Sequence, residues 1–264
     1  MQKHVIVTTS GKTHAERETY AKEAANILHC AYVVRSNLSL PQLQEQHQAE
    51  NILVVKQSGC VLHTAGGEFF FHPSMAELRL LQLKRGQSDH MLAAMALEPG
   101  MRVLDCTLGL GTDAIVASWG AGATGYVCGL EVAPLTAFIV KAGLQQFLAA
   151  RENVAPIEVL NVDYEQFLCE LPDKSFDVVF FDPMFRQPIS SSSQLKPMRS
   201  LADHRPLAET ALNEAIRVAK HRVVVKEISG SQEFCRLGIT KIYGGRYSSV
   251  QYGVIDLQAG DKDE

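Results

Sequence analysis

Four acidic residues follow apolar, strand-like runs at the point where each run ends. They are Asp105, Glu131, Asp163 and Asp182. Open parallel sheets bind ligands outside the carboxyl ends of their strands, so side chains at these positions can reach a common ligand. Each acid taken alone is explained as well by a solvated turn. The set of four predicts the rim of a ligand site, and carboxylates there would bind hydroxyl groups, amino groups or cations.

A glycine-rich turn lies inside the same region. The segment 103–114 reads VLDCTLGLGTDA, with Gly109 and Gly111 placed between a strand and a helix. Glycines at such a turn let a ligand approach the backbone, and the helix start offers free N–H groups. The sequence of residues 109–114 also fits the G-x-G-x-x-A dinucleotide-binding pattern, although any tight strand-to-helix turn can produce such a match. Glu131 follows Gly111 by 20 residues, where a carboxylate would bind ribose hydroxyls.

The acidic residues around this turn favour one ligand over another. Asp113 lies in the first helical turn, where a pyrophosphate would have to bind, so it disfavours an anion there. S-adenosylmethionine has no phosphate and carries a sulfonium and an ammonium group, which suit Asp105 and Asp113. Asp163 could meet its adenine amino group. The residues therefore predict S-adenosylmethionine as the cofactor and no metal ion.

Regular alternation of strands and helices positions these residues. The strand-like runs are 101–106, 126–132, 157–162, 177–182 and 222–228, and the helical stretches between them are 112–119, 134–150, 164–170 and 206–219. Such alternation predicts parallel β-α-β units in a doubly wound α/β sheet. The runs 238–244 and 248–257 form a terminal hairpin, so the sheet is expected to be seven-stranded and mostly parallel, with its last strand antiparallel.

The N-terminal part has a different pattern. Its short strand-like runs lie at 4–8, 31–35, 51–55, 60–64 and 68–72. One helical run lies at 13–28. Gly66-Gly67 predicts a hairpin between the last two strands. A helical pattern over 74–97, broken near Arg85-Gly86, leads into the larger unit. We therefore expect a small N-terminal α/β domain at 1–73 and the larger domain at 74–260.

Composition limits the function classes. The chain has 264 residues, 46% of them apolar, and a net charge of −4, which is unlike a basic nucleic-acid binder. The segment 184–250 departs from this average, with 11 Lys and Arg against 5 Asp and Glu. That surplus fits a local polyanion-binding face, and charge alone fits a solvated helix face slightly better. With no leader-like apolar run and no paired cysteine motif, we expect a cytoplasmic protein.

The motifs together resemble those of class I S-adenosylmethionine-dependent methyltransferases, which have a Rossmann-like fold, over roughly residues 75–257. The resemblance rests on VLDCTLGLGTDA, the acids Glu131 and Asp163, and the hairpin ending. The tetrapeptide DPMF at 182–185 is similar to the Asp/Asn-Pro-Pro-aromatic motif of amino-nitrogen methyltransferases. With KRG at 84–86, KPMR at 196–199 and RVVVK at 222–226, it resembles the RsmJ-like small-subunit ribosomal RNA guanine-N2 methyltransferase family. One departure is Arg186, which stands where that family has proline.

The resemblance implies roles for individual residues. It implies small-subunit rRNA or the 30S particle as substrate. It also implies that Thr112, Asp113, Glu131, Val132, Asp163, Tyr164 and Asp182 line the cofactor or the site, and the glycine turn itself adds Asp105, Gly109 and Gly111 to the predicted cofactor-binding set. Candidate contacts to RNA phosphates are Arg85, Arg186, Lys196, Arg199 and Lys226.

The stretch VFFDPMF at 179–185 carries the predicted catalysis. An exocyclic amine conjugated to a ring is a poor nucleophile, and it improves when acceptors hold its N–H bonds so that its lone pair faces the methyl donor. Asp182 and the Pro183 carbonyl could be those acceptors, and Phe185 could stack on the base, at about 1–3 kcal/mol. The loop 186–204 after it, with four consecutive serines, is long enough to be a functional lid.

Other functions remain compatible with these residues. The same amine chemistry would serve a methyltransferase acting on a protein or a small molecule. The glycine pattern permits an NAD-dependent oxidoreductase, which would leave DPMF unexplained. A non-catalytic adenosyl-ligand sensor or RNA-binding module would not need DPMF. His72 and His204 could act as bases, but a lone histidine is more often a structural residue.

Overall fold

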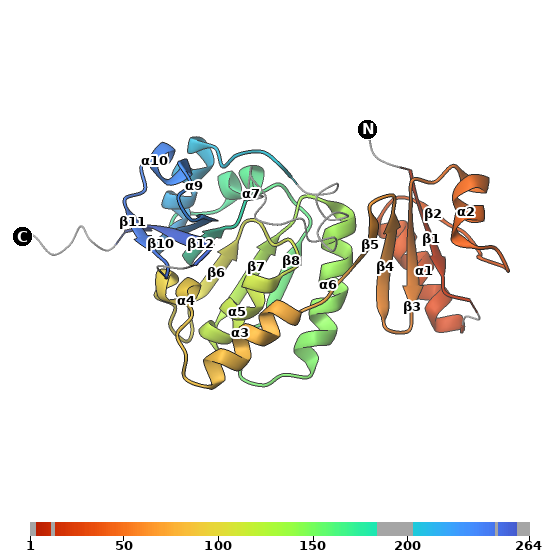
Figure 1. The fold of residues 1–264 in the computed structure, drawn as a ribbon, viewed down its shortest axis with the longest axis horizontal. Helices are drawn as coiled ribbons and strands as arrows, with labels where there is room; N and C mark the ends of the chain where they lie inside the picture. The colour runs from red at the N-terminus through yellow and green to blue at the C-terminus, as the bar shows by residue number, and fades with distance from the viewer. Residues whose placement is uncertain (1–3, 12–13, 184–202, 246–247, 258–264) are drawn as a thin grey trace, which may run out of the picture.

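The computed structural model describes residues 4–11, 14–183, 203–245 and 248–257. Two β-sheets lie side by side in Figure 1, a smaller one near the N-terminus and a larger one formed by the rest of the chain. The small sheet has the order β2-β1-β3-β4-β5. Its strands are β1 (Val5–Thr9), β2 (Ala31–Tyr32), β3 (Asn51–Lys56), β4 (Gly59–Thr64) and β5 (Gly67–Phe70), and its helices are α1 (Ala15–Ile27) and α2 (Leu40–His47).

One predicted strand in this part is shorter than expected, and one helix was not predicted. The strand expected over 31–35 ends at Tyr32. No helix was expected at 40–47, although the sequence carries its start signal: Ser39 and Gln42 form a capping box at the start of α2. The predicted hairpin is confirmed, because β4 and β5 pair antiparallel.

The larger sheet has seven strands in the order β11-β12-β10-β9-β6-β7-β8. Its strands are β6 (Arg102–Asp105), β7 (Tyr126–Leu130), β8 (Ile157–Leu160), β9 (Phe176–Phe181), β10 (Ala219–Ile228), β11 (Lys241–Tyr243) and β12 (Val250–Asp256). The helices around it are α3 (Ser74–Lys84), α4 (His90–Met95), α5 (Thr112–Ala121), α6 (Pro134–Ala149), α7 (Tyr164–Glu170), α9 (Glu209–Val218) and α10 (Glu233–Arg236). β12 is antiparallel to its neighbours β10 and β11, and the pairs β10–β9, β9–β6, β6–β7 and β7–β8 are parallel. The predicted doubly wound, mostly parallel fold is confirmed.

Strand β9 shows why an apolar run is needed at the centre of this sheet. All six of its residues are buried, because helices cover both faces. Val178 and Phe180 pack on the side of α3, α5 and α6, whereas Val179 and Phe181 pack on the side of α7 and α9. Burying one such side chain contributes about 1.5–3 kcal/mol. This packing holds the end of β9, and therefore Asp182, in a fixed position.

Helix α6 joins the two parts of the molecule. Its residue Ile139 belongs to the apolar cluster formed by α1 and the small sheet. Gly143 lies against Phe71, so closely that a Cβ added there would be 2.1 Å from the Phe71 Cγ. A glycine is therefore required at this crossing. We keep a division near residue 74 as a proposal for domain organisation, since β5 ends at Phe70 and α3 begins at Ser74. Within the described ranges, no helix combines the length and apolar character that crossing a bilayer needs.

Candidate functional site

The sheet order brings the four predicted acids to adjacent strand ends. The strands β9, β6, β7 and β8 are neighbours in that order, and each is followed or ended by one of the acids. Asp105 ends β6 and is only 2% exposed, and its Oδ1 accepts the Thr107 N–H at 3.0 Å. The Thr107 Oγ1 in turn accepts the Asp182 N–H at 2.6 Å. Thr107 therefore ties the ends of β6 and β9 together.

The glycine turn lies beside these acids and has the conformation that glycine permits. Gly109 and Gly111 have φ angles of 49° and 74°, and Gly111 is the N-cap of α5. The Glu131 carboxylate accepts the Gly109 N–H at 3.2 Å and the Ala133 N–H at 2.8 Å. Burial raises the pKa of Glu131, and these two hydrogen bonds oppose the rise. Glu131 therefore stands at the turn, and its contact with the ribose hydroxyls of a cofactor stays a prediction.

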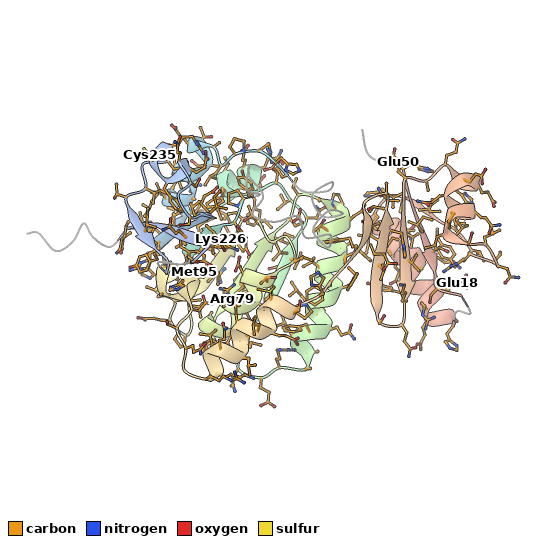
Figure 2. All side chains as sticks on the ribbon, in the orientation of Figure 1. Glu18, Glu50, Arg79, Met95, Lys226 and Cys235 are labelled. Carbon is orange, nitrogen blue, oxygen red and sulfur yellow. The ribbon has the colours of Figure 1, made fainter. Side chains whose placement is uncertain are left out.

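A chain of ion pairs crosses the site. Lys226 on β10 places its Nζ 2.8 Å from the Asp113 Oδ2 and 2.7 Å from the Asp182 Oδ2. Arg79 on α3 bonds the other Asp113 oxygen through Nη1 and bonds Asp89 through Nε and Nη2, at 2.8 and 2.9 Å. Figure 2 shows Lys226 near the strands of the larger sheet and Arg79 beside the helices α3 and α5. The chain therefore runs from the cap of α4, through the start of α5, to the end of β9.

These contacts set the charges of the buried acids. Burial raises the pKa of Asp105 to about 8, and the nearby Asp113 and Asp182 add to the rise, so Asp105 is largely protonated at neutral pH. Burial also raises the pKa of Asp182, to about 6, although Lys226 opposes the rise. For Asp113, Lys226 and Arg79 outweigh burial and lower the pKa to about 2. Asp182 and Asp113 are therefore carboxylates at pH 7.

Burial and these contacts change three of the sequence interpretations. Asp105 was expected to suit the positive groups of the cofactor, but it is 2% exposed and largely protonated, so it presents no charge to them. Asp113 was expected to face the positive groups of a ligand. Its side chain is 8% exposed and both of its oxygens bind cations, so its charge is already compensated. Lys226 was expected to contact a phosphate. Its ammonium, 17% exposed, lies between two carboxylates, and that interpretation does not fit such a position.

The other predicted residues are distributed along the same edge and beyond it. Thr112 opens α5, and Val132 is 38% exposed beside Glu131. Asp163 caps α7 through Oδ1 and pairs with Arg205 through Oδ2 at 2.7 Å, whereas the ring of Tyr164 is buried against Phe181. Arg85 is exposed at the end of α3, roughly 9 Å along the helix from Arg79. Pro183 follows β9. Four predicted residues lie outside the described ranges: Phe185, Arg186, Lys196 and Arg199.

Sequence reasoning missed four residues that shape the site. They are Arg79, Thr107, Asn161 and Arg205. Asn161 donates from Nδ2 to the carbonyl oxygens of Glu131 and Val132, at 2.7 and 3.1 Å, and so holds the end of β7. Two of the four had a signal in the sequence. Thr107 stands two residues after Asp105, the spacing of an Asx turn, and Arg79 is the only charged residue in LRLLQL (78–83).

The site suits the cofactor that the sequence predicted. The ion-pair chain holds three carboxylates, Asp89, Asp113 and Asp182, against two cations, Arg79 and Lys226. With Asp105 protonated, this ion-pair chain has one negative charge in excess, and the Glu131 carboxylate lies beside it at the glycine turn. S-adenosylmethionine carries two positive groups and one carboxylate, so its net charge complements the site. Glu131 beside the glycine turn would accept the ribose hydroxyls, and the exposed Val132 offers an apolar surface for adenine.

Comparisons with known proteins agree with this geometry. A family model described as "Putative SAM-dependent methyltransferase" matches residues 38–236. The chain is 35% identical over 254 residues to the uncharacterized protein YpiP of Bacillus subtilis, covering 95% of this chain and 98% of YpiP. It is 32% identical to the ribosomal RNA small subunit methyltransferase J of Coxiella burnetii and 36% identical to that of Pseudomonas paraeruginosa. Those two matches cover 53% of this chain and 56% of each relative.

A solved structure supports the fold over the whole chain. A SAM-dependent methyltransferase from Neisseria gonorrhoeae matches with a TM-score of 0.54 at 17% identity and covers 98% of both chains. At that identity the likeness concerns the fold alone, whereas the family model carries the assignment. The chain belongs to the family of S-adenosylmethionine-dependent methyltransferases, and its cofactor is S-adenosylmethionine.

Proposed function

We propose that this methyltransferase modifies an exocyclic amino nitrogen of small-subunit rRNA, the N2 of a guanine. Two independent lines support the proposal. Relatives named as small-subunit rRNA methyltransferases match about half of the chain at 30–36% identity. The sequence Asp182-Pro183 ends a buried strand at the carboxyl edge of the sheet, next to the glycine turn.

The observation that carries the proposal is the way Asp182 is held. Its backbone N–H is bonded to Thr107, and its carboxylate is bonded to the Lys226 ammonium. A carboxylate has about four lone-pair sites, so one bond to Lys226 leaves capacity for the N–H groups of an incoming amine. Asp182 is thus an oriented, charged acceptor at the end of a rigid strand.

Lys226 keeps that acceptor in the required state. Burial and the nearby Asp113 favour a protonated Asp182, which would donate a hydrogen bond to the amine and misalign it. The ammonium opposes both effects, so Asp182 stays ionised above about pH 6. S-adenosylmethionine supplies a methyl group already activated by its sulfonium. What this chain must provide is alignment of the amine, together with a base for the proton that the methylated nitrogen loses. Asp182 is placed for both.

Binding of RNA is expected to be modest and dependent on salt. The net charge of −4 argues against strong non-specific binding, and the local basic surplus lies after residue 184. Lys196 and Arg199 remain our predicted phosphate contacts, together with Arg85 and Arg186. Replacing Lys196 and Arg199 together by Ala should remove about two phosphate contacts and so reduce the slope of log RNA affinity against log salt concentration. Cofactor affinity should stay unchanged.

The test is mass mapping of rRNA from a strain that lacks this protein, combined with methylation of 30S particles and of their rRNA by the purified chain. One guanine should lose its methyl group in the deletion strain and regain it with the wild-type gene, but not with Asp182→Ala. If rRNA is unaltered and a protein or small amine is methylated instead, the RNA substrate is wrong and the amino-group methyltransferase remains.

A further inference from the structure

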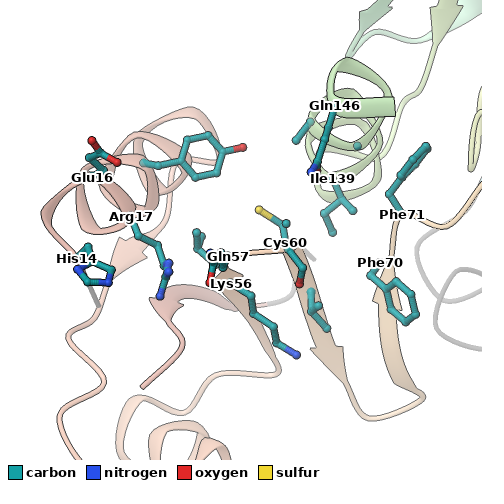
Figure 3. Close-up of a pocket in the computed structure, with 17 residues that line it drawn as sticks. His14, Glu16, Arg17, Lys56, Gln57, Cys60, Phe70, Phe71, Ile139 and Gln146 are labelled. Atoms are coloured by element: carbon teal, nitrogen blue, oxygen red, sulfur yellow. The ribbon is translucent and has the colours of Figure 1, made fainter. Parts of the chain in front are cut away.

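A cleft lies between the small sheet and helix α6, away from the acids at the strand ends. Its volume is about 630 Å³. Figure 3 shows Ile139 and Gln146 of α6 on one side, and α1 with the neighbouring ends of β3 and β4 on the other. The close packing of Gly143 on Phe71 holds the two sides together. The lining therefore includes both parts of the molecule, and nothing in the proposed methyl transfer uses it.

The side chains that line the cleft are suited to binding and unsuited to covalent chemistry. Phe70 and Tyr20 expose 43% and 37% of their surfaces. Burial raises the pKa of the Tyr20 phenol to about 12 and that of the Cys60 thiol to about 11, so both stay protonated at neutral pH. A protonated thiol is a poor nucleophile. What remains is aromatic surface with polar groups around it.

Charge and hydrogen-bonding capacity indicate the kind of ligand. Cationic side chains outnumber acidic ones in the lining, with Arg17 and Lys56 against Glu16, and His14 adds an imidazole. The amides of Gln57 and Gln146 offer both donors and acceptors. Single-stranded nucleic acids are bound by this combination: aromatic rings stack on bases, cations contact phosphates, and amide groups bind base edges.

We propose that this cleft binds an unpaired nucleotide of the RNA substrate, a short single-stranded segment away from the nucleotide that is methylated. The proposal rests on the proposed RNA substrate and adds a second contact point to it. A volume near 630 Å³ is within the range of pockets that hold ligands of nucleotide size. The base would stack on Phe70, with its phosphate near Lys56.

Helix α6 connects this cleft to the catalytic edge. It begins at Pro134, three residues after Glu131, and four of its residues line the cleft, from Ile139 to Gln146. At 1.5 Å per residue these positions lie roughly 8–18 Å along the helix from its start. A short single-stranded segment spans such a distance. Binding at both points would therefore select an unpaired site with a defined spacing between the bound base and the target base.

The test compares a cleft variant with a matched surface variant. Lys56→Ala/Phe70→Ala removes a cation and an aromatic ring of the cleft. Lys22→Ala/Ile27→Ala removes an exposed cation and an exposed apolar residue of α1 outside it. The first pair should raise the KM for rRNA roughly tenfold, since one stacked base is lost. Its kcat at saturating rRNA and its affinity for S-adenosylmethionine should stay within twofold of wild type. The control pair should change none of the three.

Photocrosslinking locates the contact independently of activity. Wild-type protein is irradiated with rRNA fragments that carry 4-thiouridine, and the crosslinked peptides are mapped by mass spectrometry. Crosslinks at Tyr20 or Phe70 support the cleft, even if no methyl transfer to RNA is seen, in which case only the proposed function fails. Methylation of rRNA with an unchanged KM in the cleft variant, or binding of free nucleoside monophosphates without any effect on RNA, overturns the cleft proposal alone. Absence of both crosslinks and RNA methylation overturns both.

Discussion

The carboxyl edge of the large sheet and the cleft beside α6 use polar side chains in opposite ways. At the edge, Asp113, Asp182 and Lys226 are largely buried and bonded to one another before any ligand arrives. In the cleft, aromatic and polar side chains line an open volume of about 630 Å³. The edge is preorganised, which methyl transfer requires because catalysis is mostly alignment. The cleft offers accessible aromatic and polar side chains, which recognition of a ligand requires.

The largest effect is expected from Asp182, because it is the group that would touch the reacting amine. Asp182→Ala removes the acceptor and should lower kcat about 100-fold or more, whereas the affinity for S-adenosylmethionine should change little. Asp182→Asn keeps one acceptor oxygen, so its kcat should lie between those of the wild type and Asp182→Ala. Single-turnover methyl transfer and cofactor titration measure the two quantities.

The matched control for this prediction is Asp173→Ala, an acid with a 75% exposed side chain that pairs with Arg217. It should leave both quantities unchanged. If Asp182→Ala weakened cofactor binding as much as it lowered turnover, Asp182 would serve to bind the cofactor. The edge would then contribute binding, as the cleft does, and not alignment of the amine.

The next effect concerns the cation that holds Asp182. In Lys226→Met the ammonium no longer opposes burial and Asp113, so the pKa of Asp182 should rise further. We expect kcat near pH 7 to fall about tenfold or more. The acid limb of the pH–rate profile, near pH 6 in the wild type, should move to higher pH, because protonation removes the acceptor.

Lys220→Met is the control, since Lys220 lies on the same strand and pairs with Asp177 away from the edge. Its profile should match the wild type. An unshifted acid limb in Lys226→Met would mean that the ion pair does not control the protonation of Asp182. A steeper salt dependence of RNA affinity in the wild type than in Lys226→Met would restore the original assignment of Lys226 to a phosphate.

The difference between these two regions also explains what could be predicted from sequence. The alternation of strands and helices predicted the large sheet, and with it the common edge that Asp105, Glu131, Asp163 and Asp182 share. The glycine turn was predicted because its signal is local. The errors in the small sheet are local too: β2 stops at Tyr32, although the β-branched residues Val33 and Val34 follow it.

The partners of the acids could not be predicted in this way. Arg79 lies 34 residues before Asp113, and Lys226 lies 113 residues after it. Such pairs depend on how α3 and β10 pack on the sheet, which no short pattern encodes. The charge of Asp113 therefore looked available to a ligand, whereas the fold uses it internally. The cleft was invisible for the same reason, because its lining comes from α1, the β3–β4 turn, the end of β5 and α6.

A smaller effect is expected at the cofactor end of the edge. Glu131→Ala removes the acceptor assigned to the ribose hydroxyls and should weaken S-adenosylmethionine binding by about 1–3 kcal/mol in calorimetry. Glu165→Ala, a neighbouring acid in the first turn of α7, should leave the affinity unchanged. Equal affinities in Glu131→Ala and wild type would show that Glu131 serves only to hold Gly109 and Ala133.

The smallest effect on activity is expected from Asp105, whose influence is on stability. Its pKa of about 8 in the folded protein lies above the ordinary value of about 3.9 in an unfolded chain. The folded state therefore binds more protons between these values, and the free energy of unfolding should fall as the pH rises from about 4 to 8. One group of this kind contributes a slope of at most about 1.4 kcal/mol per pH unit.

Asp105→Asn imitates the protonated acid and keeps an oxygen for the Thr107 N–H, so it should remove this slope. Denaturant unfolding of both proteins at several pH values measures this slope. The free energy of unfolding of the variant should rise relative to that of the wild type as the pH approaches 8. Parallel curves would mean that Asp105 is ionised in the folded protein. Asp105 and the ion-pair chain would then hold two excess negative charges instead of one, and the sulfonium and ammonium of the cofactor would be needed to balance them.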